Sequence, residues 1–312
     1  MERFKNILVV HEDGENGRAT LARAVKLADR NGADLTLIRI IDQIPDDYKM
    51  LITAMTPDEI MQESVREQEK KLTQYVSSFA IPISVQVSSG REFIEIIRQV
   101  LKNGHDLVIK TARGMTSSWG MLFGSTAMHL LRKCPCPVWL VKPGSGERYR
   151  RIMAAVDVAP PEIGENDLNV KIIELAGSLA RLEKSELHIV QAWEKPDETF
   201  LSDHLNNTLG DMNILLHESK NMHIQRLHDF LDDFDLQGLQ YQEHVIPGWA
   251  DDVIPEFAGE KNIDLIVMGT VCRTGIAGFF MGNTAEKILH RVTCSVLAVK
   301  PDDFTTPVSL EK

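Results

Sequence analysis

The sequence predicts an α/β protein in which one open-sheet domain occurs twice in tandem. Three observations lead to this fold class. The chain has 312 residues, and domains of about 150 residues are typical, so two are expected. A long segment of the first half recurs in the second half. Within each half, short apolar runs alternate with helical patterns, as in parallel βαβ units that carry helices on both faces of the sheet.

The internal repeat defines the domain organisation. Residues 106–143 align with residues 264–301 without a gap, at an offset of 158 positions. The matched pairs include Gly120 with Gly278, Gly124 with Gly282, Thr126 with Thr284, and Cys136 with Cys294. We therefore expect a first domain at 1–143, a linker at 144–150, a second domain at 151–301 and a tail at 302–312.

The elements of the first copy follow from apolar spacing and from turn residues. Asn31-Gly32 ends a helix at 18–30, and Pro57 opens a long helix that reaches about Phe79. Residues 92–102 place Phe93, Ile96, Ile97 and Val100 on one helix face. The expected strands are 5–10, 35–41, 83–87, 107–111 and 138–141.

The second copy repeats this order, with strands at RIMAAV, ELHIVQA, YQEHVI, LIVMG and SVLAV. Its long helix, expected at 211–236, has one apolar stripe. We expect that stripe to be buried, namely Ile214, Ile224, Leu227, Leu231 and Phe234. The acidic side chains between them should be exposed, namely Asp229, Asp232, Asp233 and Asp235.

Composition excludes several classes of protein. With 34 basic and 45 acidic residues the net charge is −11, which argues against a general binder of nucleic-acid backbones. No apolar run approaches the roughly 18–20 residues of a membrane helix, and the N-terminus lacks a signal-peptide layout. Four cysteines are too few for a disulfide scaffold. We expect a cytoplasmic protein with reduced thiols.

Candidate binding residues follow the strands. In an open α/β sheet, ligands bind beyond the carboxyl ends of the strands, where the strand order reverses. His11-Glu12 in the first copy and Asp157 in the second copy are expected at these ends. The segments 111–126 and 269–284, rich in glycine and hydroxyl residues, follow the fourth strand and lead into a helix, an arrangement suited to phosphate but equally consistent with a simple turn.

These segments, together with the strand AAVD and the proline-flanked CPCPVWLVKP, resemble the universal stress protein family. The resemblance extends over the chain twice and points to the tandem type. It implies Rossmann-like (adenine nucleotide alpha hydrolase-like) domains, each with five parallel strands in the order 3-2-1-4-5. It also implies that the two domains pair through the last strands, at 138–141 and 296–299, as an intramolecular pseudo-dimer, and leaves a homodimer of whole chains open.

In members of the family that bind ATP, the acidic residue after strand one holds adenosine, and the glycine segment with its Ser/Thr holds the phosphates. The resemblance therefore implies Glu12, Gly114, Gly124 and Ser125 in the first copy, with Thr111 in place of the first glycine. In the second copy it implies Asp157, Gly269 and Gly282, with Cys272 in place of a glycine and Asn283 in place of Ser/Thr. Neither set is complete.

The first copy ranks as the better phosphate site by charge. Lys110 and Arg113 lie near its glycine segment, Thr126 follows Ser125, and residues 1–143 carry a net charge of +2. Residues 144–312, which include Thr284 beside Asn283, carry −13. A cation can stabilise bound phosphate, although one such contact contributes only about 1–2 kcal/mol.

No catalytic residues or metal ligands are predicted. The signatures H-E-x-x-H, G-x-S-x-G and the lysine P-loop are absent. Cys134, Cys136 and Cys294 are interpreted as buried structural thiols. The histidines His204, His217, His223 and His228 are interpreted as a solvated helix face. Two functions remain: a stress-response protein that binds a ligand or an unidentified protein partner without dedicated catalysis, and an ATP-binding protein in which slow hydrolysis acts as a switch. The incomplete segments favour the first.

Overall fold

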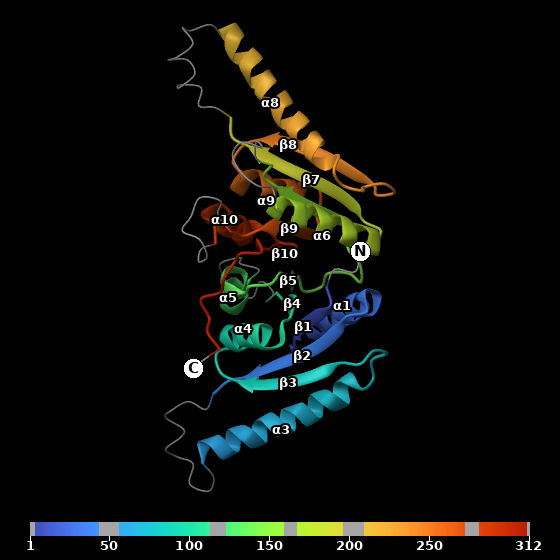
Figure 1. Cartoon of the computed structure of the whole chain (residues 1–312), viewed down its shortest axis with the longest axis vertical. Helices are drawn as coiled ribbons and strands as arrows, with labels where there is room; N and C mark the ends of the chain where they lie inside the picture. The colour runs from blue at the N-terminus through green and yellow to red at the C-terminus, as the bar shows by residue number, and fades with distance from the viewer. Residues whose placement is uncertain are drawn as a thin grey trace. The chain divides into compact units, whose positions relative to one another are not determined.

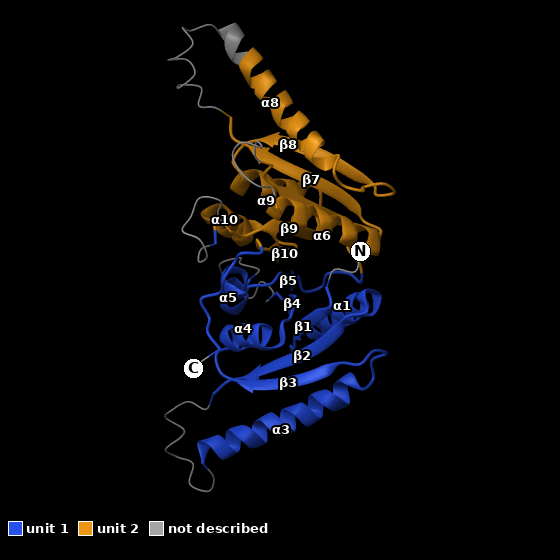
Figure 2. Cartoon of the chain, in the orientation of Figure 1, with its two compact units in different colours: residues 1–147, 273–281, 302–312 blue, residues 148–272, 282–301 orange. Residues whose placement is uncertain are grey.

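The computed structural model describes residues 4–43, 56–112, 123–158, 167–195, 209–271 and 281–310. The chain forms two compact units, shown in blue and orange in Figure 2. Unit 1 comprises Met1–Glu147, Arg273–Met281 and Asp302–Lys312, and unit 2 comprises Arg148–Cys272 and Gly282–Pro301. The C-terminal tail thus belongs to the first unit. There, Arg98 Nε donates a hydrogen bond of 3.1 Å to the carbonyl of Ser309, and Phe304 is buried.

Unit 1 is a parallel five-stranded sheet with helices on both faces (Figure 1). The strands are β1 (Asn6–Val10), β2 (Asp34–Ile41), β3 (Ser84–Ser89), β4 (Leu107–Thr111) and β5 (Val138–Val141). The helices are α1 (Glu15–Asn31), α3 (Pro57–Val76), α4 (Glu92–Asn103) and α5 (Ser125–Lys133). The strands pair in the order β3-β2-β1-β4-β5. The order reverses between β1 and β4, so the crevice for a ligand is expected there.

Unit 2 repeats this arrangement. Its strands are β6 (Arg151–Val156), β7 (Glu186–Trp193), β8 (Tyr241–Pro247), β9 (Leu265–Gly269) and β10 (Ser295–Val299). Its helices are α6 (Asp167–Glu183), α8 (Leu209–Leu231), α9 (Ala250–Glu260) and α10 (Asn283–Arg291). The strands pair in parallel in the order β8-β7-β6-β9-β10. Right-handed crossovers place α6 and α8 on one face and α9 and α10 on the other.

Local sequence signals explain how the helices begin and end. Gly32 adopts the left-handed conformation, with φ 56°, directly after α1, as the Asn31-Gly32 signal predicted. A capping box starts α3: the Thr56 hydroxyl accepts the Glu59 amide, and the Glu59 carboxylate accepts the Thr56 amide. The predicted apolar face of α4 is buried, namely Phe93, Ile96, Ile97 and Val100.

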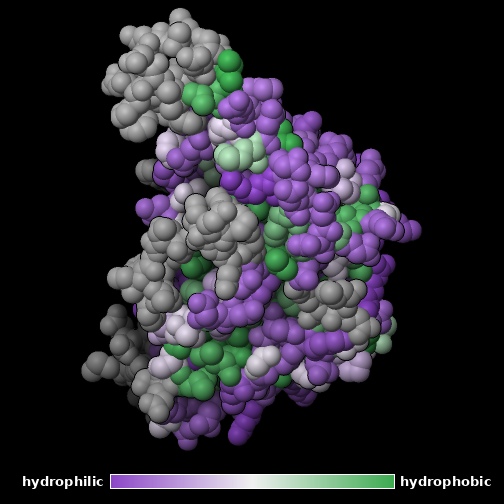
Figure 3. All heavy atoms as spheres, turned by 45° about the horizontal axis from the view of Figure 1, so that its top comes forward, coloured by the Kyte–Doolittle hydropathy of each residue, from purple (hydrophilic) through white to green (hydrophobic). Residues whose placement is uncertain are grey.

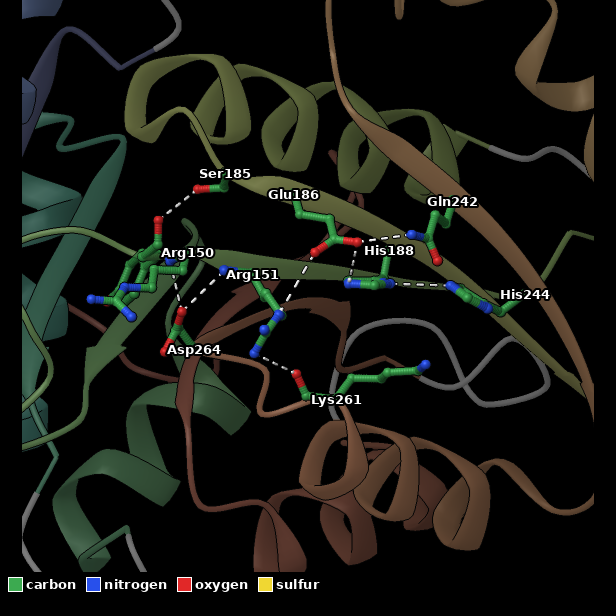
Figure 4. Close-up of polar contacts among 10 residues, drawn as sticks. Arg150, Arg151, Ser185, Glu186, His188, Gln242, His244, Lys261 and Asp264 are labelled. Atoms are coloured by element: carbon green, nitrogen blue, oxygen red, sulfur yellow. Dashed lines mark hydrogen bonds and ion pairs between the residues drawn. The ribbon is translucent and has the colours of Figure 1, made fainter.

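The repeated aspartates Asp106 and Asp264 serve the same structural purpose in the two units. The Asp106 carboxylate accepts the backbone amides of Lys5 and Asn6 at 2.6 and 3.1 Å. The Asp264 carboxylate accepts those of Arg150 and Arg151 at 2.7 and 3.0 Å (Figure 4). Each aspartate therefore fixes the amino end of the central strand of its sheet, where the first backbone N–H groups would otherwise lack a partner.

The prediction for the long helix of unit 2 is only half right. Leu227 and Leu231 are buried and the four aspartates are exposed. Phe234 is only half-buried and lies beyond the helix, which ends at Leu231 rather than at 236, and Ile214 and Ile224 are 57% and 41% exposed. The end of α8 near Leu231 packs on β8, whereas its beginning extends past the sheet (Figure 1). Hydrophobic residues consequently reach the surface where α8 begins, at the top of Figure 3.

Candidate functional site

The carboxyl edge of unit 1, where the carboxyl ends of its strands lie, holds an ion-pair network around the buried Lys110. Lys110 lies in β4 and is 4% exposed. Its ammonium contacts the Glu12 carboxylate, which follows β1, and donates to Oε1 of Glu92 at 3.0 Å. The second oxygen of Glu92, Oε2, accepts a hydrogen bond of 2.8 Å from the Thr126 hydroxyl in the first turn of α5. Three predicted site residues, Glu12, Lys110 and Thr126, thus lie close together. The group that joins Lys110 to Thr126 is the carboxylate of Glu92.

Sequence reasoning missed Glu92. This residue begins α4, two positions after Gly90, and its partners lie 18 and 34 positions further along the chain. Comparison of the two copies could have singled out Glu92. The backbone is alike before α4 and α9, where Gly90 and Gly248 have positive φ values of 147° and 140°. The side chains differ, because the same offset of 158 matches Glu92 with Ala250 and Lys110 with Met268.

The remaining predicted residues of unit 1 lie at the start of α5 or outside the described residues. Gly124 is the N-cap of α5, with φ −73°, and Ser125 is exposed in the first turn. Arg113 and Gly114 are not among the described residues. Thr111, which stands where the family has a glycine, donates a 2.9 Å hydrogen bond to the Thr20 hydroxyl of α1. The buried hydroxyl of Thr111, which replaces the family's glycine, therefore has a hydrogen-bond partner within the protein.

A hollow of about 450 Å³ opens beside Glu12. Its lining includes His11, Asp13, Arg39 and Tyr75. Arg39 donates to both carboxylate oxygens of Asp13, at 3.0 and 2.9 Å, and this hydrogen bonding lowers the pKa of Asp13. Burial lowers the pKa of His11, although the hydrogen bond with Asp13 opposes the shift. The hollow thus combines an aromatic wall with an internally neutralised ion pair.

The carboxyl edge of unit 2 is built differently. Asp157 is exposed after β6, and its backbone is held by Asn169 of α6. The Asn169 side chain accepts the Asp157 amide at 3.1 Å and donates to the Asp157 carbonyl at 2.8 Å. Gly269 ends β9, and a Cβ there would lie 2.7 Å from the Leu168 side chain. Close packing of α6 against β9 therefore explains this glycine without a ligand.

Helix α10 begins at the same edge. Gly282 is its N-cap, with φ −63°, and Asn283 and Thr284 are exposed in its first turn. In unit 1 the equivalent threonine, Thr126, is half-buried against Glu92. Cys272 is not among the described residues.

Trp193 and His223 form an aromatic pair at this edge of unit 2. Trp193 ends β7, and its ring stacks on that of His223 from α8, with centroids 5.1 Å apart. The buried atoms Trp193 Nε1 and His223 Nδ1 find no hydrogen-bond partner among the described residues. Burial lowers the pKa of His223, while the negative charge of Asp157 opposes the shift. His217 and His228 are exposed as predicted, but His223 is not, and His204 is not among the described residues.

A second polar cluster lies toward the amino ends of β7 and β8 (Figure 4). His188 Nδ1 and His244 Nε2 are 3.1 Å apart, and Glu186 lies on the other side of the His188 ring, at 3.6 Å. Burial lowers the pKa of both histidines, that of His244 to about 4. Because desolvation keeps both rings neutral, the cluster is a structural pair near neutral pH.

The predicted structural thiols are buried. Cys134 and Cys136 have sulfur atoms 3.6 Å apart, and Cys294 is buried in unit 2. The hydrogen bond with Cys134 and burial raise the pKa of the Cys136 thiol, which keeps it protonated and poorly nucleophilic. Within the described ranges, no three His, Cys, Asp or Glu residues are grouped as metal ligands. None of the described helices is both long and apolar enough to cross a membrane.

Comparisons with known proteins agree with the repeat. The model of the Universal stress protein family matches residues 3–142 and 148–300. Universal stress protein E of Escherichia coli K12 is 31% identical, over 100% of this chain and 98% of that protein. A homologue from Haemophilus influenzae is 29% identical, over 96% of this chain and 98% of that protein.

Two solved structures share the fold along almost the whole chain. A functionally unknown protein from Pseudomonas aeruginosa PAO1 is 25% identical, with a TM-score of 0.70 over 97% of this chain and 94% of that one. A universal stress protein from Archaeoglobus fulgidus is 18% identical, with a TM-score of 0.62 over 96% of this chain and 99% of that one.

Proposed function

Since the chain belongs to the universal stress protein family, we propose that it acts in the stress response by binding a ligand, without dedicated catalysis. The ligand that fits the proposal is an adenine nucleotide, held at the carboxyl edge of unit 2. In this assignment Asp157 and the Trp193–His223 pair bind the nucleoside, and the first turn of α10, with Asn283 and Thr284, binds the phosphates.

The observation that carries the proposal is that the buried nitrogens Trp193 Nε1 and His223 Nδ1 have no hydrogen-bond partner in the part of the chain that the structure describes. A buried polar group without a hydrogen bond costs about 1–3 kcal/mol, so a ligand that offers an acceptor to Trp193 Nε1 and a hydrogen-bond partner to His223 Nδ1 gains affinity. The charge of Asp157, an acidic residue after the first strand of the domain, acts on the His223 ring and raises its pKa against the effect of burial. An aromatic pair, an acidic residue and a helix N-terminus at one sheet edge suit a base, a ribose and a phosphate respectively.

The net negative charge of residues 144–312 repels an anionic ligand, but we expect this repulsion to be weaker than the contacts with the base, the ribose and the phosphates. Charges separated by more than about 8 Å are largely screened at physiological salt, so the groups within the edge decide the affinity. In unit 1 the charge of Lys110, which favoured that copy on sequence grounds, is already neutralised by Glu12 and Glu92. We therefore favour unit 2.

Equilibrium dialysis of the purified chain against labelled ATP tests the proposal. We expect saturable binding of one ATP per chain. Recovery of the bound nucleotide after a long incubation separates the two functions, because ligand binding alone leaves ATP intact whereas a hydrolytic switch releases ADP and phosphate. No saturable binding would remove the nucleotide from the proposal, and steady formation of ADP would contradict the non-catalytic function.

A further inference from the structure

We propose that Glu92 determines which of the two homologous edges accepts a phosphate-bearing ligand, because its carboxylate occupies the phosphate position of unit 1. The inference rests on the proposed function for the identity of the ligand, but it concerns a residue to which that function gives no part.

The position of the Glu92 carboxylate is the first step. Its Oε2 accepts the hydroxyl of Thr126 at 2.8 Å, in the first turn of α5. An anion is stabilised at that end of a helix, where backbone N–H groups lack partners inside the helix. Neither the Gly124 cap nor the first turn of α5 supplies an acidic side chain of its own. Glu92 comes from α4 and provides the negative charge that a phosphate would otherwise bring.

The second step is that Lys110 fixes this carboxylate in place. The ammonium lies 3.0 Å from Glu92 Oε1 and also contacts Glu12. Lys110 is almost fully buried, and a buried ammonium requires partners because its desolvation is costly. An incoming phosphate would therefore have to displace the Glu92 carboxylate from both Lys110 and Thr126.

The third step is the contrast within the same chain. At the matched positions unit 2 has Ala250 in place of Glu92 and Met268 in place of Lys110, while Thr284 matches Thr126. The local backbone is equivalent, since Gly90 and Gly248 donate to the carbonyls that end β2 and β7, at 3.2 and 2.9 Å. Thr284 is exposed, whereas Thr126 is half-buried. The first turn of α10 has an acidic residue of its own, Glu286, which lies 3.7 Å from His290 Nε2. Removal of the Glu92 carboxylate should therefore free Thr126 from a contact that Thr284 does not have, without making the two edges identical.

Labelled ATP binding to four full-length variants tests this inference. Glu92→Ala should add a second site to the chain, or tighten binding at unit 1 at least tenfold. Glu95→Ala is the matched control, because Glu95 lies one turn further along α4 and pairs with Arg98 at 2.7 Å. It should leave binding unchanged. In the reciprocal experiment, Ala250→Glu should weaken binding at unit 2 at least tenfold, whereas Ala250→Gln, of similar size but uncharged, should weaken it much less.

The outcomes separate this inference from the proposed function. If the unaltered chain binds one ATP and Glu92→Ala still binds one with unchanged affinity, Glu92 does not exclude phosphate and the inference is overturned while the proposed function stands. If the unaltered chain binds none and Glu92→Ala binds one, the inference stands and the assignment to unit 2 fails. Absence of binding in both overturns both. Circular dichroism and thermal unfolding verify that each variant is folded.

Discussion

Gly17 shows how closely α1 approaches the candidate edge of unit 1. It lies in the first turn of that helix, and a Cβ at this position would be only 1.9 Å from the carbonyl oxygen of Glu12. The contact is with backbone, which cannot move aside as the end of a flexible side chain can. The turn that presents Glu12 to Lys110 therefore requires a glycine at position 17.

Substitution of Gly17 by alanine should destabilise unit 1 by about 1–3 kcal/mol, the usual cost of overpacking. Gly259 in α9 is the matched control, since nothing lies within 4 Å of a Cβ at that position. Gly259→Ala should be neutral or stabilising by up to about 1 kcal/mol, because alanine has the higher helix propensity. Urea unfolding measures both. Equal stability of the two variants would contradict the close approach.

The histidine pair in unit 2 predicts a pH dependence of stability. The pKa of His244 is lowered to about 4 in the folded chain, mainly by burial, and that of His188 is also lowered. The unfolded chain therefore binds more protons than the folded chain as the pH falls. The contribution of the two neutral histidines to the free energy of unfolding is at its maximum above about pH 6.5 and decreases as the pH falls toward 4. Each proton contributes a slope of at most about 1.4 kcal/mol per pH unit.

Urea unfolding of the unaltered chain and of His244→Asn, between pH 7.5 and 4.5, checks this dependence. The variant should have a shallower slope over that range because one titrating group is gone. Parallel curves would show that His244 is not the group responsible.

Helix α8 illustrates what an apolar stripe predicts and what it does not. The stripe identified the helix and its buried residues near the C-terminal end, Leu227 and Leu231. It could not indicate where the sheet beneath the helix ends, because that depends on the length of β8. Ile214 and Ile224, placed on the same stripe, are consequently exposed.

Two alanine substitutions test this difference along α8. Leu227→Ala should cost about 2–5 kcal/mol of unfolding free energy, as a fully buried leucine does. Ile224→Ala should cost less than about 1 kcal/mol, because that side chain already contacts solvent. Comparable losses in thermal unfolding would mean that the beginning of α8 is covered as well.

The carboxyl edges show the limit of sequence reasoning at the level of elements. Periodic apolar residues and turn signals were sufficient for the strands and helices, because both signals are local. The partners of Lys110 were not predicted: Glu12 and Glu92 lie 98 and 18 positions away in the chain, and only the folding of β1, β4 and α4 brings them together. Charge counted along the sequence therefore ranked unit 1 first, although its lysine is neutralised in the structure.

At the scale of the whole molecule, the chain contains two domains of the same fold whose side chains differ at the carboxyl ends of the strands. The resemblance to the family predicts that their last strands, at 138–141 and 296–299, pair with one another. Hydrogen exchange followed by mass spectrometry tests that prediction. If the strands pair, both segments should exchange slowly throughout, since amides on both sides of each strand are bonded. Rapid exchange of alternate amides in both segments would indicate unpaired edges.

Nucleotide binding is proposed at only one of the two carboxyl edges. Gly124 and Gly282 allow a matched test, because both are N-caps in the extended region of backbone conformation, with φ of −73° and −63°. Valine adopts that conformation without strain, so it adds bulk at the start of the helix and little else.

Labelled ATP binding to Gly124→Val and Gly282→Val is the most direct measurement of the central claim. We predict that Gly282→Val loses binding at least tenfold, while Gly124→Val binds as the unaltered chain does. Loss of binding in Gly124→Val alone would place the ligand in unit 1 and contradict the account.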